Sequence, residues 1–481
     1  MAIDQITTGI IKNDAVTTAK IVNDAVTAGK IVAGAVVADV ANDSITAAHL
    51  ANGAIDHADK IASGVVTNVK LGADAVDGTK LADNAINSEH VTAGAIDTAH
   101  IGDDQVTGAK IENDPTIAGK LTVAGDFVPS SPISNRNMII NGAQRIWQRG
   151  DSFPGTGSSR YNGDRFKYEG SSLGAWTISR AGDYPTGFSA STKFLCTTAD
   201  ASPGTNDHGF LQYRMEGQDL RHLKKGSADA LPTTLSFWVK TNLTGTWQVN
   251  LQDQDNNRII GKTYTVTAAN TWEHKSLTFP GDTTGAYSND TGLSLIIEWA
   301  LGAGTGYSSG AVPTAWESHS GGTPDRAAGM TVNLASATGN TFFITGIQYE
   351  VGNNATPFEH ITYGDDLARC QRYAVGFGGY TAYDWLGTGG YNTSGVKCHV
   401  TLPQMMRAVP IVESVGTVSH WAATSDAAAG GTVTAIAKAG SVHDFNHITL
   451  DVSFSGGSNG NTWSVTGNNN TSAKIIIAAE L

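Results

Sequence analysis

The sequence predicts a mainly β protein in which a fibrous trimeric shaft of ten-residue repeats is followed by two β-sandwich domains. Three observations lead to this prediction. A ten-residue phrase recurs from about residue 3 to residue 122, and all ten tryptophans lie downstream of it, beginning at Trp147. The downstream sequence consists of short alternating or apolar runs separated by Gly, Asn and Asp turns. We divide the chain into a shaft (1–126), a linker (127–133), a jelly-roll β-sandwich (134–374) and a small C-terminal β-sandwich (375–481).

Each repeat, in about eleven copies, carries two apolar positions and one capping residue. In one unit Val16 is followed by Thr17, a residue type that caps a starting helical turn, and Ile21 comes five places after Val16. Two apolar side chains per unit bury too little surface to offset chain entropy, and no aromatic residue precedes Phe127. The shaft therefore needs further copies of the chain, and three is the natural closed number by analogy with other fibrous shafts. We expect the core of this homotrimer to contain Val16, Ile21, Val26, Ile31, Ile61, Leu71, Leu81, Ile101 and Ile111.

Two alternatives for the repeats stay open. A disordered low-complexity linker would not require apolar residues to hold a strict period. A parallel β-solenoid of a single chain is the other alternative, although a ten-residue unit is short for one coil. His49, His57, His90 and His100 also recur here, and three of them stand at the Lys position of the repeat. We expect solvated side chains at these positions, unless three copies stack on a threefold axis and hold an ion.

Composition excludes several classes of protein. A net charge of −13 and a pI near 5.4 argue against a nucleic-acid binder, which would present a basic face. Cys196, Cys370 and Cys398 are widely spaced, which favours three separate thiols over a single bridge and indicates no zinc site. The N-terminus has no basic segment followed by an apolar core, so we expect no signal peptide. No apolar run approaches the ~18 residues that span a membrane, so we expect no membrane insertion.

The downstream runs predict individual elements. Strands of the first sandwich are expected at 235–240, 247–252, 264–266, 276–279, 293–299 and 342–349. Strands of the second sandwich are expected at 396–402, 448–454 and 473–478. One helix is expected at 365–373, where Asp365 and Asp366 would lie at the positive end of the helix dipole.

Three stretches resemble sequences of phage tail fibres. Ile139-Ile140-Asn141-Gly142-Ala143-Gln144-Arg145-Ile146-Trp147-Gln148-Arg149-Gly150 resembles the opening of a jelly-roll domain that is similar to carbohydrate-binding modules. The stretch from Ile347 to Glu359, followed by Leu367-Ala368-Arg369-Cys370-Gln371-Arg372-Tyr373, resembles the ending of that domain. Leu402-Pro403-Gln404-Met405-Met406-Arg407-Ala408-Val409-Pro410 is similar to a signature of the small sandwich that often follows, and the repeats are similar to the shafts of such fibres.

The resemblance implies a virion protein that is made in the host cytoplasm, is released by lysis and contacts other virion proteins at its N-terminal end. Trp147 and Phe358 of the motifs are expected to be core aromatics rather than ligand contacts. The sequence departs from the pattern at Ala374, where such fibres usually carry an aromatic residue. It also shows no separate anchoring domain before the repeats, which leaves the mode of attachment to the virion open.

No nucleophile elbow, P-loop, paired zinc ligands or glycine fingerprint is present, so we expect a non-enzymatic protein without cofactor or metal. The expected function is attachment to a host cell-surface glycan, recognised downstream of the repeats by aromatic residues on loops. Trp316 and Trp385 are expected to be exposed, and the alternative is that the loop aromatics pack against a neighbouring protomer. A purely structural head-attached or tail decoration fibre and a polysaccharide depolymerase remain as alternative functions. The glycan-binding candidates are Tyr307, Trp316, Tyr380, Tyr383, Trp385 and Tyr391.

Overall fold

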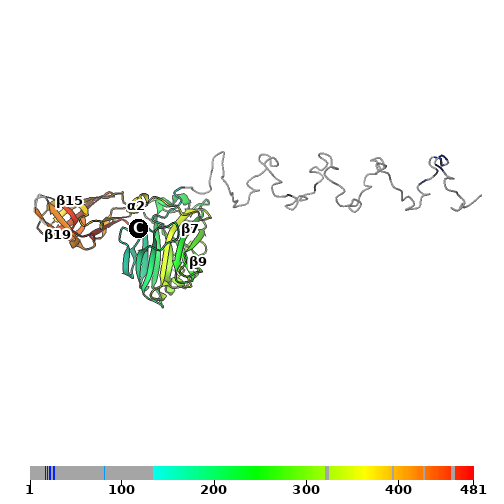
Figure 1. Ribbon diagram of the computed structural model, residues 1–481, viewed down its shortest axis with the longest axis horizontal. Helices are drawn as coiled ribbons and strands as arrows, with labels where there is room; N and C mark the ends of the chain where they lie inside the picture. The colour runs from blue at the N-terminus through cyan, green and yellow to red at the C-terminus, as the bar shows by residue number, and fades with distance from the viewer. Residues whose placement is uncertain are drawn as a thin grey trace, which may run out of the picture. The chain divides into compact units, whose positions relative to one another are not determined.

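A computed structural model of the protein describes residues 134–319, 324–392, 395–425, 428–456 and 461–481, with isolated positions between 17 and 91 (Figure 1). The chain divides into two compact units, Met1–Thr122 and Val123–Leu481. Of the expected shaft core, Ile21 and Leu81 are described, and they are 44% and 42% exposed in the single chain. The other seven core positions, the recurring histidines and the linker lie outside the described residues, so the trimeric shaft stays a prediction.

The described part is mainly β, which confirms the predicted fold class, and its first portion consists of two antiparallel sheets. The first sheet has the order β1 (Ser152–Thr156), β4 (Ala175–Ala181), β5 (Ser191–Thr198), β13 (Thr341–Val351), β7 (Thr233–Thr241) and β10 (Glu273–Phe279). The second has the order β12 (Glu317–Ser318), β9 (Arg258–Val266), β8 (Gly245–Asp253), β11 (Leu293–Ala303), β6 (His208–Glu216), β3 (Phe166–Ser171) and β2 (Arg160–Tyr161). Figure 1 labels one strand of each sheet, β7 and β9.

Alternating side chains of the two sheets build one apolar core. Leu235, Phe237 and Val239 of β7 are buried, and so are Trp247 and its alternating neighbours on β8. Successive side chains of a strand point to opposite faces, so a period of two places every second residue between the sheets. Each fully buried side chain of this size stabilises the fold by about 1.5–3 kcal/mol. The alternation of apolar residues therefore predicted these strands correctly.

The C-terminal part is a closed barrel joined to a small sheet. The barrel has the order β15 (Trp385–Asn392), β16 (Gly395–Thr401), β20 (His447–Phe454), β19 (Ala428–His443), β18 (Trp421–Ser425) and β21 (Thr462–Gly467). The small sheet has the order β14 (Ala374–Gly378), β22 (Lys474–Ala478) and β17 (Ile411–Ser414). Trp421 and Trp463 are fully buried at the centre of this part.

The longest helix of the described residues, α2 (Tyr363–Gln371), connects the jelly-roll portion to β14. The Oγ1 atom of Thr362 accepts a hydrogen bond from the backbone N–H of Asp365 at 3.2 Å, which caps the helix. Asp365 and Asp366 lie in its first turn, as the sequence predicted. The predicted helix is confirmed, with boundaries two residues earlier.

The motifs that resemble tail fibres hold the jelly-roll portion and the C-terminal part together. The Arg149 guanidinium donates to both carboxylate oxygens of Glu413 (2.8 and 2.6 Å) and to Glu480 (3.2 Å). Arg407 donates to the carbonyl oxygens of Thr291, Ala479 and Glu480 at 2.7–2.9 Å. The Arg149 ion pairs and the Arg407 bond to Thr291 cross between the two parts and are called the junction contacts, so these motif residues act in assembly of the fold.

The first motif also sets a local turn. Asn141 has a φ of +58°, and its side-chain oxygen accepts from the backbone N–H groups of Arg145 and Ile146. Trp147 is buried in the jelly-roll core, as expected, whereas Phe358 is half-buried and stacks edge-on against Phe188.

The three cysteines are buried and free, which confirms the expectation of separate thiols. Across the described ranges, no helix has the length and apolarity needed to cross a membrane.

Candidate functional site

The outer face of the second sheet, the first surface to consider for a ligand, is filled by the chain itself. Glu298 on β11 is fully buried there, although its side chain points away from the apolar core. Its carboxylate accepts hydrogen bonds from Gln212 and Gln252 at 2.7 and 2.9 Å and forms a two-point ion pair with Arg326. The segment that follows β11 therefore satisfies this polar face from within the molecule.

The same segment makes further contacts with the sheet. The Gln248 side chain donates to the carbonyl of Asp325 and accepts from the N–H of Gly329, both at 2.7 Å. The Arg326 guanidinium lies 4.2 Å from the centre of the Phe210 ring and 5.3 Å from that of Tyr307. A saccharide cannot reach this face without displacing these contacts.

Three of the six predicted glycan-binding residues are packed into the fold. Tyr307 is half-buried on the short helix α1 (Thr305–Ser308), with its ring 4.6 Å from the His208 ring. Trp316 is half-buried against the jelly-roll core and donates its indole N–H to the Pro280 carbonyl at 2.9 Å, so the expectation that it is an exposed loop aromatic is wrong. Tyr391 packs against Phe454 and Trp463 in the barrel core.

The other three predicted residues are close in sequence and exposed. Tyr380, Tyr383 and Trp385 are 79%, 65% and 61% exposed. Asp384 orders their loop, because its carboxylate accepts from the backbone N–H groups of Tyr380 (2.7 Å) and Thr381 (3.0 Å). Burial alone would raise the pKa of Asp384, but these hydrogen bonds outweigh it and lower that pKa. The exposed aromatics are thus held in a defined loop rather than on a free chain.

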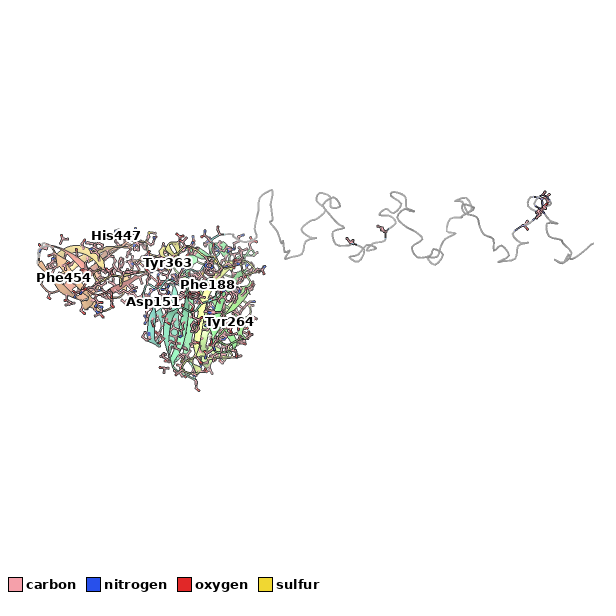
Figure 2. The ribbon with its side chains drawn as sticks, viewed as in Figure 1. Asp151, Phe188, Tyr264, Tyr363, His447 and Phe454 are labelled. Atoms are coloured by element: carbon pink, nitrogen blue, oxygen red, sulfur yellow. The ribbon has the colours of Figure 1, made fainter. Side chains whose placement is uncertain are left out.

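A groove of about 290 Å³ begins at this loop and lies between the jelly-roll portion and the C-terminal part. We call it the junction groove. One wall carries Tyr363 and the residues around Gln148, and the other carries Tyr380 and a glycine-rich segment of β14. Figure 2 labels Asp151 and Tyr363, two residues that line it. Its lining residues are Arg145, Ile146, Trp147, Gln148, Gly150, Asp151, Arg180, Tyr363, Leu367, Gln371, Gly376, Gly378, Gly379, Tyr380 and Lys474.

Glycines shape the floor of the junction groove. Gly378 has a φ of +78°, and a Cβ atom there would lie 2.2 Å from the Ala473 carbonyl oxygen. A Cβ atom on Gly376 would lie 2.9 Å from the carbonyl oxygen of Gln148. A side chain at Gly376 would therefore clash with the opposite wall, and one at Gly378 would clash within the C-terminal part.

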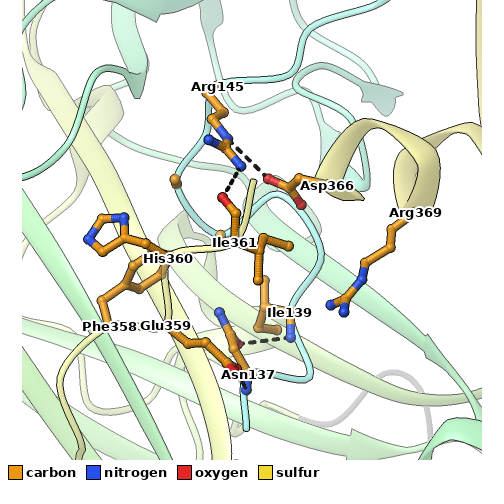
Figure 3. A pocket seen from close by; sticks show the side chains of 11 residues that line it. Asn137, Ile139, Arg145, Phe358, Glu359, His360, Ile361, Asp366 and Arg369 are labelled. Atoms are coloured by element: carbon orange, nitrogen blue, oxygen red, sulfur yellow. Dashed lines mark hydrogen bonds and ion pairs between the residues drawn. The ribbon is translucent and has the colours of Figure 1, made fainter. Parts of the chain in front are cut away.

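Three other cavities in the described part of the chain lack the combination of open space and exposed aromatic rings. The cavity of Figure 3 lies beside Arg145, which pairs with Asp366 at 3.3 Å and donates to the Ile361 carbonyl at 2.8 Å. Its volume of about 20 Å³ accommodates a single water molecule. A larger cavity of about 360 Å³ has Tyr287 as its aromatic residue, and Tyr287 is buried. A third, of about 390 Å³ beside Gly261 and Val312, contains no aromatic residue.

The junction groove presents the chemistry that sugars require. Tyr363 and Tyr380 are exposed phenol rings that offer an apolar face and a polar hydroxyl. Arg180 and Lys474 add cationic donors, and Asp151 adds an acceptor. Across the described ranges, no three His, Cys, Asp or Glu residues are placed to hold a metal ion.

Sequence reasoning identified Tyr380 but missed Tyr363, Arg180 and Lys474. One signal was available for Lys474, because it is the only charged residue in the apolar run from Ala473 to Ala478. Arg180 and Tyr363 carry no comparable local signal. They join the groove only through the packing of β4 and α2 against the C-terminal part.

No protein-family model and no curated protein sequence matches the chain. Among solved structures, one similar structure is the enzymatically active domain of tailspike protein 4 from bacteriophage CBA120, with 14% identity, 45% of this chain covered and a TM-score of 0.25. The match spans 21% of that structure's length. A xylan-binding domain of carbohydrate-binding module family 22 has 12% identity over 43% of this chain and 99% of its own, with a TM-score of 0.23. A putative sugar-binding protein of Bacteroides thetaiotaomicron has 11% identity over 45% of this chain and 100% of its own, with a TM-score of 0.25.

Proposed function

We propose that the protein is a non-enzymatic virion fibre that attaches to a host cell-surface glycan through the junction groove. The observation that carries this proposal is the ordered loop of Tyr380, Tyr383 and Trp385 beside an open groove, in a fold whose other large polar face is occupied internally. The resemblance of the motifs and repeats to tail fibres supports the wider role. In this role the chain is a homotrimer, and other virion proteins hold its N-terminal end.

Aromatic rings contribute to sugar binding because their faces cover the apolar C–H surface of a pyranose ring, while nearby polar groups bind its hydroxyls. Three copies held on one shaft would raise the effective concentration of weak individual sites without any new contact. A single groove with modest affinity is therefore enough for attachment.

The test is binding of the full-length chain to a glycan array, with Tyr380→Ala and Tyr363→Ala as the variants, because both side chains are exposed and line the groove. Tyr184→Ala is the matched control, because Tyr184 is 43% exposed and does not line the groove. We expect saturable binding by the wild-type and control chains and a loss of about tenfold or more in the two variants, the effect of about 1.4 kcal/mol per lost ring contact.

Two outcomes would favour the alternatives. Absence of binding to every glycan by the well-folded wild-type chain would favour a purely structural fibre. Release of reducing sugar from a bound polysaccharide would favour a depolymerase and contradict the non-enzymatic role.

A further inference from the structure

The charge of the junction groove is opposite to that of the chain. The chain carries a formal net charge of −13. The groove is lined by three cationic side chains, Arg145, Arg180 and Lys474, and by one carboxylate, Asp151. A concave surface with a local positive excess concentrates anions, even on a molecule that repels them elsewhere.

The three cations differ in how many hydrogen bonds and ion pairs they already form within the protein. The Arg145 Nε atom lies 3.3 Å from the Asp366 carboxylate, and its guanidinium also donates to two backbone carbonyls. The Arg180 side chain lies 3.9 Å from the Asp151 carboxylate, and the two side chains are 40% and 69% exposed. Arg145 is therefore a structural cation, whereas Arg180 keeps most of its donors for a ligand.

Lys474 has the fewest direct partners of the three cations. It begins β22, its side chain is half-buried, and no hydrogen bond or ion pair joins its ammonium group to any residue in the described ranges. Burial lowers the pKa of Lys474, and the more distant carboxylates of Asp151 and Asp164 only oppose that effect. A partly desolvated ammonium without a direct partner gains strongly from an anionic ligand.

We propose that the glycan bound in the junction groove is acidic, with the carboxylate of one sugar residue held by Lys474 and Arg180. This inference rests on the proposed attachment function and specifies the class of its ligand. The ring of the same sugar lies against Tyr380 or Tyr363, which line the groove with the two cations. The carboxylate forms an ion pair with the ammonium of Lys474 and accepts hydrogen bonds from the guanidinium of Arg180.

The test is an array that prints each carboxylate-containing glycan beside its carboxyl-reduced counterpart, together with neutral and sulfated glycans. The full-length chain is compared with Lys474→Gln and Lys474→Arg. The control is Lys397→Gln, because Lys397 is exposed, pairs with Asp451 at 2.9 Å and lies on β16 of the barrel. Lys397→Gln and Lys474→Gln change the net charge equally, so the comparison separates a local contact from long-range attraction. Retention of the fold is checked by the denaturation midpoint of each variant.

We expect the wild-type chain to prefer carboxylate glycans over their reduced counterparts. Lys474→Gln should weaken that binding about 10- to 100-fold, the range for one lost charge-assisted hydrogen bond. Lys474→Arg and Lys397→Gln should retain it.

Equal binding of acidic and carboxyl-reduced glycans, or of sulfated glycans alone, would overturn the assignment of a carboxylate but leave the attachment function standing. Unchanged binding by a folded Lys474→Gln variant would also overturn it. Failure to bind any glycan would contradict the attachment function itself.

Discussion

Replacement of Lys225 by Met tests a deeply buried lysine of the jelly-roll portion. The Nζ atom of Lys225 lies 2.5 Å from the Asp253 carboxylate and 3.1 Å from that of Asp282. It also donates to the carbonyl oxygens of Thr284 (2.8 Å) and Gly285 (2.7 Å). The exposed fractions of the Lys225, Asp253 and Asp282 side chains are 4%, 0% and 3%, so the network is almost entirely removed from solvent.

The expected loss in the free energy of unfolding depends on the partners that each carboxylate retains in the variant. Removal of one partner of a buried pair costs about 3–5 kcal/mol, because the other charge is left unneutralised. Asp282 keeps Arg258, whose Nε atom lies 2.7 Å away, and Asp253 keeps hydrogen bonds from Asp255 and Asn256. We therefore expect a loss near the lower end, about 3 kcal/mol in the free energy of unfolding.

The measurement is urea denaturation followed by tryptophan fluorescence. The control is Lys397→Met, which breaks the exposed pair with Asp451 and should change stability by less than about 1 kcal/mol. In the double variant Lys225→Met/Asp253→Asn the stranded charge is removed, so most of the loss should be recovered. The reasoning is refuted if Lys225→Met is no more destabilising than Lys397→Met.

A second readout uses calcium. The Lys225→Ala variant leaves two carboxylates and two carbonyl oxygens around the vacated position, a ligand set of the kind that Ca²⁺ prefers. Added calcium should raise the unfolding free energy of this variant and leave that of the wild-type chain unchanged.

Three further predictions concern pH, the junction and assembly. Burial raises the pKa of Asp164 from 3.8 to about 6. Between these pH values the folded chain therefore binds more protons than the unfolded chain. The contribution of Asp164 to the free energy of unfolding should fall by up to about 3 kcal/mol as pH rises from 4 to 6. Asp164→Asn should remove that part of the pH dependence in denaturation curves. Arg407→Ala should cost about 1.5–3 kcal/mol, measured by urea denaturation, because it removes a charged donor from the Thr291, Ala479 and Glu480 carbonyls. Light scattering should give a stable trimer of 50.1 kDa chains, and a well-folded monomer would contradict the shaft prediction.

Sequence patterns predicted the elements whose stability is local or periodic. The expected runs at 235–240, 247–252 and 293–299 lie within β7, β8 and β11, because each alternates apolar residues toward one core. The helix was predictable from its acidic first turn. By contrast, β19 (Ala428–His443) consists largely of Ala, Gly and Thr, and nothing in that composition indicates a strand of 16 residues.

The candidate site was predictable only in part, because it is assembled from contacts distant in sequence. The exposed loop of Tyr380, Tyr383 and Trp385 was expected from its aromatic, glycine-rich composition. The inward packing of Tyr307 and Trp316 could not be expected from local sequence. Tyr307 lies against Arg326, which pairs with Glu298 28 positions away, and Trp316 donates to Pro280, 36 positions away. The partners of Arg149 in the C-terminal part, Glu413 and Glu480, are more than 260 positions away, and no local pattern predicts such pairs.

The junction contacts and the junction groove depend on one another. One wall of the groove belongs to the jelly-roll portion and the other to the C-terminal part, so the width of the groove is set by how the two parts are held. Arg149 and Arg407 hold them together without lining the groove. Weakening either contact should therefore reduce glycan binding although neither residue touches the ligand, whereas Lys474→Gln should reduce binding and leave the junction contacts intact. On this proposal Arg149 and Arg407 are needed for glycan binding although neither side chain lines the groove.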